Sequence, residues 1–458
     1  MDIVEPDTIA AISTAPGVGA VALVRVSGSR SSAVLAALAP DLGALAPREA
    51  RVAAIHDPGT REPIDQAIVV RYPGPASYTG EDVIEIWGHG GWLGPALVLD
   101  ACLAVGARMA EAGEFTRRAY LNGRMDLVQA EAVTDLIGGR SRALRRAALG
   151  QLDRGLSARV ADLRSGLVGL EALLVHHLDF PEEDDAPAPV ARIAERADDL
   201  AAALAQLLDT AAEGELLREG ALAVLAGLPN SGKSSLFNAL LGQERAIVTE
   251  VPGTTRDALE ATVALGGFPF RLVDTAGLRE SEDRVERIGV EVARRYLAAA
   301  DLVLLCVEGS RALGTDERAF LEAADAPVVV VRTKADLGAE PTGLSLEPPR
   351  GAYAAVRVSA LRGQGLGELR ELLPRLTYRG LVAARADAPV LTRARQARAV
   401  ESALGEVRAF ARALRDGVGP EVASAHLRPA ETALEELLGV ITPEDVLDCV
   451  FAEFCVGK

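Results

Sequence analysis

The sequence predicts a multidomain α+β and α/β protein, in which an α/β nucleotide-binding domain is inserted into an all-helical domain. Three observations lead to this prediction. A GxxxxGKS string occupies residues 227–234, between an apolar run and a helical pattern. Alternating strand and helix patterns follow it to about residue 378, as in a parallel α/β sheet. Helical sequence rich in Ala, Leu, Arg and Glu flanks it, at about 113–220 and from 388 onward.

Residues up to about 112 mix short strands with helical stretches, which indicates an N-terminal α+β domain. The expected elements are strands at Thr8–Thr14, Ala20–Val26, Ala67–Tyr72 and Val83–Trp87 and a helix at Trp92–Leu103. The expected domains are 1–117 (N-terminal), 118–220 (helical, first part), 221–378 (inserted, nucleotide-binding) and 379–458 (helical, second part). Insertion is tolerated because the two ends of a domain often lie close together.

The GxxxxGKS string is predicted to be a phosphate-binding loop. It follows the apolar strand Ala221–Ala226 and opens the helix Ser235–Leu241. Backbone N–H groups of such a loop wrap the β-phosphate, Lys233 reaches the β- and γ-phosphates, and Ser234 ligates Mg²⁺. The positive end of the helix dipole adds to the attraction.

Other parts of a Ras-like P-loop GTPase follow at suitable distances. A strand ends in Asp274, which is expected to hold Mg²⁺ through water, and the N–H of Gly277 would sense the γ-phosphate. Thr255 lies in a candidate switch loop and would ligate Mg²⁺ when the γ-phosphate is present. Residues Thr262–Val273 are expected to form a hairpin that turns at Gly266-Gly267.

Base choice rests on the segment 333–336, which follows the expected strand Pro327–Arg332. Asp336 can accept hydrogen bonds from guanine N1–H and the exocyclic amine together, which favours GTP over ATP. GTPases usually carry Asn where this chain has Thr333, so weaker guanine binding is expected. Ser359-Ala360, after the strand Tyr353–Val358, fits the loop that closes over the base. The expected GTP contacts are Asn230, Ser231, Gly232, Lys233, Ser234, Ser235, Thr249, Glu250, Val251, Pro252, Gly253, Thr254, Thr255, Asp274, Thr275, Ala276, Gly277, Thr333, Lys334, Asp336, Ser359 and Ala360.

The hydrolytic machinery departs from that of Ras-like proteins. Leu278 stands where they place a water-orienting Gln, and no internal arginine finger is evident, so the missing charge must come from elsewhere. Asn230 can help to bind a monovalent cation beside the phosphates. The backbone carbonyls of Thr249 and Val251 and the region of Thr254 would complete its shell. Glu286 is the acidic residue best placed to orient water, although its spacing alone favours a solvated helix face.

Composition limits the remaining choices. A chain of 458 residues that is 49% apolar can form two or three cores. Its net charge of −17 argues against a broad nucleic-acid surface. No stretch has the length of a membrane span and the start lacks a basic leader, so a soluble, cytoplasmic protein is expected. The four cysteines show neither metal spacing nor a disulfide framework.

Several segments outside the GTPase motifs carry a resemblance to a known family. They are Asp7–Ile12, Gly19–Gly28, Ser77–Asp82, His89–Gly91, Gly113–Arg124 and the tail Cys455-Val456-Gly457-Lys458. Together with the GTPase block, they make the whole chain similar to the MnmE (TrmE) family of tRNA-modification GTPases.

The resemblance implies an N-terminal domain that binds 5,10-methylene- or 5-formyl-tetrahydrofolate and forms a homodimer. By position, Arg25, Glu85, Arg124 and Lys458 correspond to the folate contacts. A cross-strand surface pair is the plainer interpretation of Arg25 and Glu85, and Arg124 replaces the usual Lys, which changes the donor geometry.

The resemblance also assigns catalytic roles. It implies K⁺ in place of an arginine finger, held by Asn230, Thr249, Val251 and Thr254, and a water-orienting role for Glu286. The two GTPase domains of a dimer would meet across their switch loops. Cys455 is either a nucleophilic thiolate or a packing residue beside the folate.

The implied activity is GTP-driven modification of tRNA. In a heterotetramer with a flavin-dependent partner of the MnmG or GidA type, the chain would add a carboxymethylaminomethyl or aminomethyl group at C5 of uridine 34, in the anticodon stem-loop. Two alternatives stay open. One is a ribosome-assembly GTPase of the Era or Der type, and the other is a folate enzyme in which the GTPase only regulates.

Overall fold

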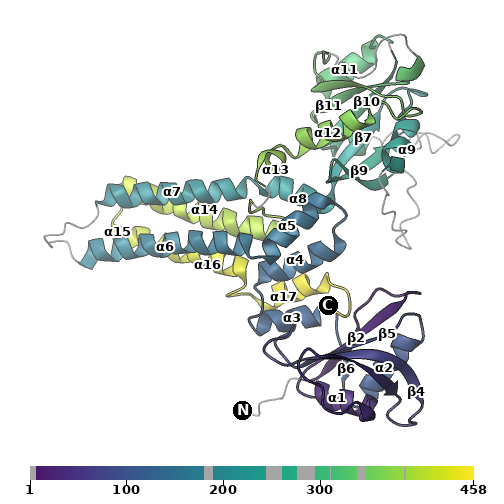
Figure 1. Cartoon of the computed structure of the whole chain (residues 1–458). Coiled ribbons are helices and arrows are strands. Elements are labelled where there is room, and N and C mark those ends of the chain that lie inside the picture. Colours follow the sequence, from purple (N-terminus) through teal and green to yellow (C-terminus); the bar gives the residue numbers. More distant parts are fainter. Residues whose placement is uncertain are drawn as a thin grey trace. The chain divides into compact units, whose positions relative to one another are not determined.

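The computed structural model describes residues 7–179, 189–243, 260–275, 294–309, 311–337, 347–385 and 388–458 (Figure 1). The chain forms two compact units, one of Met1–Thr134 with Glu435–Lys458 and the other of Asp135–Leu434. The predicted multidomain α+β and α/β class is confirmed by a helical part and two sheets. The units do not follow the four expected segments, so that finer division stays a prediction.

The first unit is built on a six-stranded sheet with the strand order β3-β4-β5-β2-β1-β6. Its strands are β1 (Ile9–Ile12), β2 (Val21–Ser27), β3 (Ala50–His56), β4 (Pro63–Tyr72), β5 (Val83–His89) and β6 (Arg108–Met109). Its helices are α1 (Ser31–Leu38), the short η1 (Pro40–Leu42), α2 (Gly94–Ala104), α3 (Glu114–Leu121) and α17 (Glu444–Ala452). All strand pairs are antiparallel except β1 with β6.

The larger core cluster of the first unit lies on one face of this sheet. Val24, Ile84 and Ile86 pack with residues of α1 and α2 in a single buried cluster. Because side chains alternate along a strand, their neighbours Arg25 and Glu85 lie on the opposite face. The alternation thus places the polar residues that the resemblance selects on that second face, beside a smaller buried cluster of Ile9, Ala11, Ala110 and Phe115.

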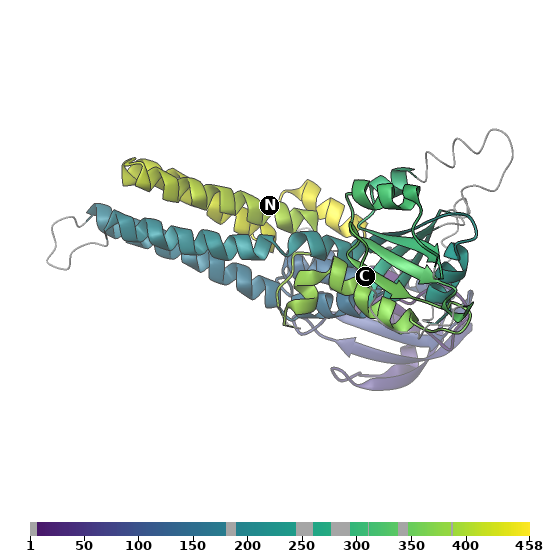
Figure 2. The same ribbon diagram turned by 90° about the horizontal axis from the view of Figure 1, so that it is seen from above.

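The second unit contains a bundle of long helices, α6 (Gly155–Asp179), α7 (Val190–Leu208), α14 (Ala394–Arg415) and α16 (Leu427–Leu438), which lie side by side (Figures 1 and 2). The shorter helices around it are α5 (Arg142–Leu152), α8 (Ala211–Glu219), α13 (Arg379–Ala383), α15 (Pro420–Ala423) and η4 (Ser424–His426), while α4 (Leu127–Gly138) runs from the first unit into the second. A buried ion pair joins Asp135 to Arg393 at 2.7 Å, where the chain returns to the bundle.

Between α8 and α13 the chain forms the inserted sheet, with the strand order β12-β11-β10-β7-β9-β8. Its strands are β7 (Ala221–Ala226), β8 (Glu260–Leu265), β9 (Phe268–Asp274), β10 (Leu302–Glu308), β11 (Val328–Thr333) and β12 (Ala354–Arg357). Its helices are α9 (Lys233–Gln243), α11 (Thr315–Ala323), η3 (Ala335–Leu337) and α12 (Leu366–Thr377). Every residue of the central strand β7 is buried, as expected for a parallel strand covered on both faces.

The β8–β9 hairpin turns at Gly266-Gly267, as predicted. Leu265 pairs with Phe268, and both turn glycines have positive φ, +55° and +86°. A two-residue hairpin turn of this kind needs left-handed backbone at both positions, which only glycine adopts freely. The turn also contacts the helical part, because the Ala143 N–H donates to the Gly267 carbonyl at 2.9 Å.

Tyr378 marks the junction at which the chain leaves the inserted sheet. Its hydroxyl donates to the Pro269 carbonyl at 2.6 Å, lies 3.0 Å from the Leu216 carbonyl oxygen and accepts from the Ala221 N–H at 3.2 Å. One buried phenol therefore touches α8, the first residue of β7 and the start of β9. Burial raises the pKa of Tyr378, so it remains a neutral donor.

Candidate functional site

The phosphate loop joins the end of β7 to the start of α9, as the motif predicts. The Lys233 ammonium lies buried over the loop and donates to the carbonyls of Gly227 and Leu228 at 3.1 and 2.9 Å. Asn230, Ser234 and Ser235 are exposed at the helix start. The first turn of a helix presents N–H groups that are not used within the helix, so this position favours an anion.

Asp274 lies beside this loop at the end of β9. It pairs in register with Leu225 of β7, and the neighbouring Thr275 hydroxyl donates to the Leu225 carbonyl at 2.8 Å. Burial raises the pKa of the Cys306 thiol to about 12, while the nearby charges of Lys233 and Asp274 act on it in opposite directions. Lys233 and Asp274 are therefore both close enough to Cys306 to act on its pKa.

The expected base-binding residues gather at the ends of β11 and β12. The Ser359 hydroxyl donates to Asp336 at 2.6 Å, and this hydrogen bond lowers the pKa of the Asp336 carboxyl. Lys334 has a left-handed backbone, with φ +53°, and pairs with Glu308 at 3.1 Å. The Thr333 hydroxyl donates to the Ser231 carbonyl of the phosphate loop at 2.5 Å. An ionised, oriented carboxylate is thus presented next to the phosphate site.

A second cluster forms on the other face of the N-terminal sheet, opposite α1 and α2. Arg25 and Glu85 face each other across β2 and β5, and the guanidinium Nε and Nη2 donate to one carboxylate oxygen at 3.1 and 2.9 Å. The guanidinium also lies over the rings of Tyr78 and Phe115, 5.3 and 5.7 Å from their centroids. The pair is cross-strand, as the plainer interpretation expected, but it is buried rather than on the surface.

Lys458 joins this cluster from the tail. Burial and the positive charge of Arg25 lower the pKa of the Lys458 ammonium, which Glu85 partly offsets. Tyr72 approaches from β4, since burial and the charge of Glu85 raise the pKa of its hydroxyl. Within the described residues, the buried Nη1 of Arg25 has no hydrogen-bond partner. This donor is therefore available to an oxygen or nitrogen acceptor that binds at the cluster.

The tail is fastened along β1. The Ser13 hydroxyl donates to the Gly457 carbonyl at 2.9 Å, and Val456 forms a β-bridge with Ala112. Gly457 has φ +98°, and a Cβ there would lie 2.4 Å from the Ile12 carbonyl oxygen. Only glycine fits this close approach, which explains why glycine stands before Lys458. Cys455 is exposed beside it.

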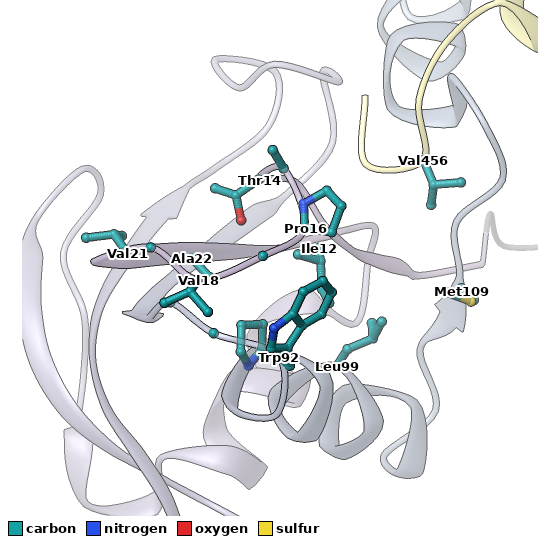
Figure 3. Close-up of a pocket in the computed structure, with 16 residues that line it drawn as sticks. Ile12, Thr14, Pro16, Val18, Val21, Ala22, Trp92, Leu99, Met109 and Val456 are labelled. Atoms are coloured by element: carbon teal, nitrogen blue, oxygen red, sulfur yellow. The ribbon is translucent and has the colours of Figure 1, made fainter. Parts of the chain in front are cut away.

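A pocket of about 610 Å³ opens next to the tail (Figure 3). Its walls come from residues 14–19, the turn at 90–92, α2 and Val456. Val18 and Trp92 are 87% and 73% exposed at this pocket. Adjoining exposed apolar side chains of this kind mark an interaction surface more often than isolated ones do.

Comparison with known proteins decides the family. Residues 8–124 match the family model described as the GTP-binding protein TrmE N-terminus, and residues 127–455 match the MnmE helical domain. The tRNA modification GTPases MnmE of Moorella thermoacetica and Heliobacterium modesticaldum are each 42% identical to the chain, over 99% of both chains. The chain belongs to the MnmE family of tRNA modification GTPases. Membership makes it a GTP hydrolase that takes part in tRNA modification.

Among solved structures, the G domain of the T. maritima FeoB iron transporter aligns with 34% of this MnmE-family chain and 98% of that chain. The aligned residues are 28% identical and the TM-score is 0.25. No helix in the described part of the chain is both long and apolar enough to cross a membrane.

Several expected site residues lie outside the described residues, so their roles stay predictions. They are Thr249, Glu250, Val251, Pro252, Gly253, Thr254, Thr255, Ala276, Gly277, Leu278 and Glu286. Arg124 is exposed, and a Cβ on Gly80 would lie 3.3 Å from its Cγ, so its stem runs over the 77–82 loop. Sequence reasoning did not select Tyr72 or Tyr78, although Tyr78 stands inside a segment that carries the family resemblance.

Proposed function

We propose that this MnmE-family chain is a K⁺-dependent, cytoplasmic GTP hydrolase that acts with a flavin-dependent protein of the MnmG or GidA type. Together they add a carboxymethylaminomethyl or aminomethyl group at C5 of uridine 34 in certain tRNAs, with a folate as the one-carbon donor. The observation that carries the proposal is the convergence of Arg25, Glu85 and Lys458 in a chain that also has a GTP site.

In the GTP site, the chain's own groups would neutralise and orient the triphosphate. Lys233 exchanges its two loop carbonyls for phosphate oxygens, and the α9 N-terminus supplies backbone donors. Mg²⁺ would be held by Ser234, by Thr255 and, through water, by Asp274, and it would neutralise charge that develops on the phosphates. The exposed Ser234 and the buried Asp274 beside β7 fit such an ion.

We propose K⁺ as the substitute for an arginine finger, because Leu278 cannot orient water and Asn230 is exposed on the phosphate loop. Asn230, Thr249, Val251 and Thr254 would hold the ion, and Glu286 would orient the water. We expect GTP hydrolysis in KCl to exceed that in NaCl at equal ionic strength by at least tenfold. Equal rates in the two salts would remove the cation from the proposal.

The Arg25 cluster fits a folate by its chemistry. Glu85 can accept from the amide and amine edge of a pterin, the unpartnered Arg25 Nη1 can donate to a ring acceptor, and Lys458 and Arg124 suit carboxylates. A folate would supply the one-carbon unit. The exposed Cys455 remains open to two roles, nucleophile or packing residue.

We also propose a homodimer in which a second copy covers the apolar pocket around Trp92, and a heterotetramer with the partner. Burial of Val18 and Trp92 by another copy would remove apolar surface that is now exposed to water. We further propose that the chain is divided into an N-terminal domain (1–117), a helical domain in two parts (118–220 and 379–458) and a nucleotide-binding domain inserted between them (221–378).

Two measurements test the proposal. Mass spectrometry of wobble uridine from cells that lack the protein should show the C5 modification missing. A C5 modification that persists in these cells would favour a regulatory GTPase. Glu85→Gln should weaken binding of 5-formyl-tetrahydrofolate at least tenfold while GTP hydrolysis stays within twofold. Folate affinity unaltered by that change would refute the assignment of the cluster.

A further inference from the structure

Thr333 connects the base-binding loop to the phosphate loop. It closes β11 and is 4% exposed. Its hydroxyl lies 2.5 Å from the Ser231 carbonyl oxygen and 3.3 Å from the Val307 carbonyl oxygen, both acceptors. A hydroxyl has one hydrogen to donate, so the shorter contact with the phosphate loop uses it.

Packing supports this connection. A Cβ on Gly232 would lie 3.2 Å from both the Cβ and the hydroxyl oxygen of Thr333. The threonine therefore rests directly against the backbone of the phosphate loop. Its own carbonyl accepts from the Gly309 N–H at 2.7 Å, which fixes the backbone on the other side.

Asp336 is held by different groups. Its carboxylate accepts from Ser359, and the intervening Ala335 N–H donates to the Val358 carbonyl at 3.2 Å. The Asp336 carboxylate is half-buried beside Ser359, whereas the Thr333 side chain points to the phosphate loop. The two residues therefore perform separate tasks.

We infer that Thr333 is a positioning and specificity-determining residue, which fastens the base loop to the phosphate loop and leaves the N7 edge of guanine without a side-chain donor. Asp336 is then the side chain that selects guanine, through N1–H and the exocyclic amine. An asparagine has two amide hydrogens, so it can satisfy the Ser231 carbonyl and still offer one hydrogen to N7. The inference rests on GTP as substrate and is independent of the proposed folate and uridine chemistry.

The test compares GTP with 7-deaza-GTP, which lacks the N7 acceptor, on the full-length protein. The wild-type protein should bind the two within twofold. Thr333→Asn should bind GTP about fivefold more tightly and should now lose about fivefold with 7-deaza-GTP, the effect of one net hydrogen bond. The inference would be overturned if the wild-type protein bound 7-deaza-GTP at least fivefold more weakly than GTP. It would also be overturned if Thr333→Asn bound GTP and 7-deaza-GTP equally well.

Two further variants test the connection itself. Thr333→Val keeps the shape but leaves the Ser231 carbonyl unpaired, so both nucleotides should dissociate about tenfold faster and by the same factor. Thr333→Ser keeps the hydroxyl but loses the methyl group, and it should dissociate as slowly as the wild type. If only the volume of Thr333 mattered, Thr333→Ser would instead be the faster of the two variants. Dissociation rates of Thr333→Val equal to those of the wild type would refute the connection. Thermal unfolding of each variant establishes that it is folded.

Discussion

The hydroxyl of Tyr378 offers a sharp test of how the inserted domain is anchored. Tyr378→Phe removes one oxygen and keeps the ring, which stacks on Phe268 and meets Phe270 edge-on, with centroids 4.8 and 5.7 Å away. The ring contacts should survive, so the change isolates the hydrogen bonds to Pro269, Leu216 and Ala221.

The magnitude follows from the partners left behind. The Ala221 N–H loses this acceptor and the Pro269 carbonyl loses its nearest hydroxyl donor, in a site from which water is excluded. A buried polar group left unsatisfied costs about 1–3 kcal/mol, and partial relaxation suggests a total of about 2 kcal/mol. For a domain of this size that loss corresponds to a fall of about 4–8 °C in melting temperature.

Differential scanning calorimetry of the full chain measures this fall. The transition of the inserted domain is identified as the one that moves upward when GDP is added. Tyr353→Phe is the matched control, because Tyr353 is 56% exposed and its ring, which the change keeps, stacks with Arg379. Its shift should stay within about 1 °C. The reasoning fails if Tyr378→Phe shifts this transition no more than Tyr353→Phe does.

Further predictions concern the tail and the bundle. Gly457→Ala places a Cβ against the Ile12 carbonyl, so folate affinity measured by titration should fall at least tenfold while GTP hydrolysis is kept. Gly417→Ala is the control, because Gly417 also has a positive φ, +77°, but faces open space, and this variant should keep both activities. Equal folate affinity in the two variants would contradict the docking of the tail along β1. Asp135→Asn removes the charge that faces the buried guanidinium of Arg393, so urea unfolding should show a loss of about 3 kcal/mol. A loss below about 1 kcal/mol would mean that the other neighbours of Arg393 suffice.

The sequence predicted best where chemistry and local pattern coincide. The apolar run before the phosphate loop is β7, residue for residue, and Gly266-Gly267 is the predicted turn. The strand β3 and helix α1 were not predicted. Their alanine-rich sequences, ARVAAIH and SSAVLAAL, have little period or β-branched character, so sheet pairing and packing decide them.

The contacts that define the sites are long-range and could not be predicted from spacing. Lys458 approaches Arg25 only because the tail docks along β1, and Thr333 meets Ser231 only once β11 lies beside the phosphate loop. The sequence suggested weaker guanine binding from the missing amide of Asn. The structure adds that the Thr333 hydroxyl already donates to the Ser231 carbonyl. This hydrogen bond depends on where β11 ends relative to the phosphate loop.

The Tyr378 junction also bears on the order in which the chain folds. Glu213 accepts hydrogen bonds from the N–H groups of Gly380 and Leu381, residues more than 160 positions away in sequence. Closing an unstructured loop of that length costs about 4–5 kcal/mol of chain entropy. If the inserted domain folds first, it holds together the two points at which the chain enters and leaves it, after α8 and before α13. The helices α7 and α14 are then close to each other instead of being joined by a long random coil. The nucleotide-binding domain would then act as a folding template for the bundle around it.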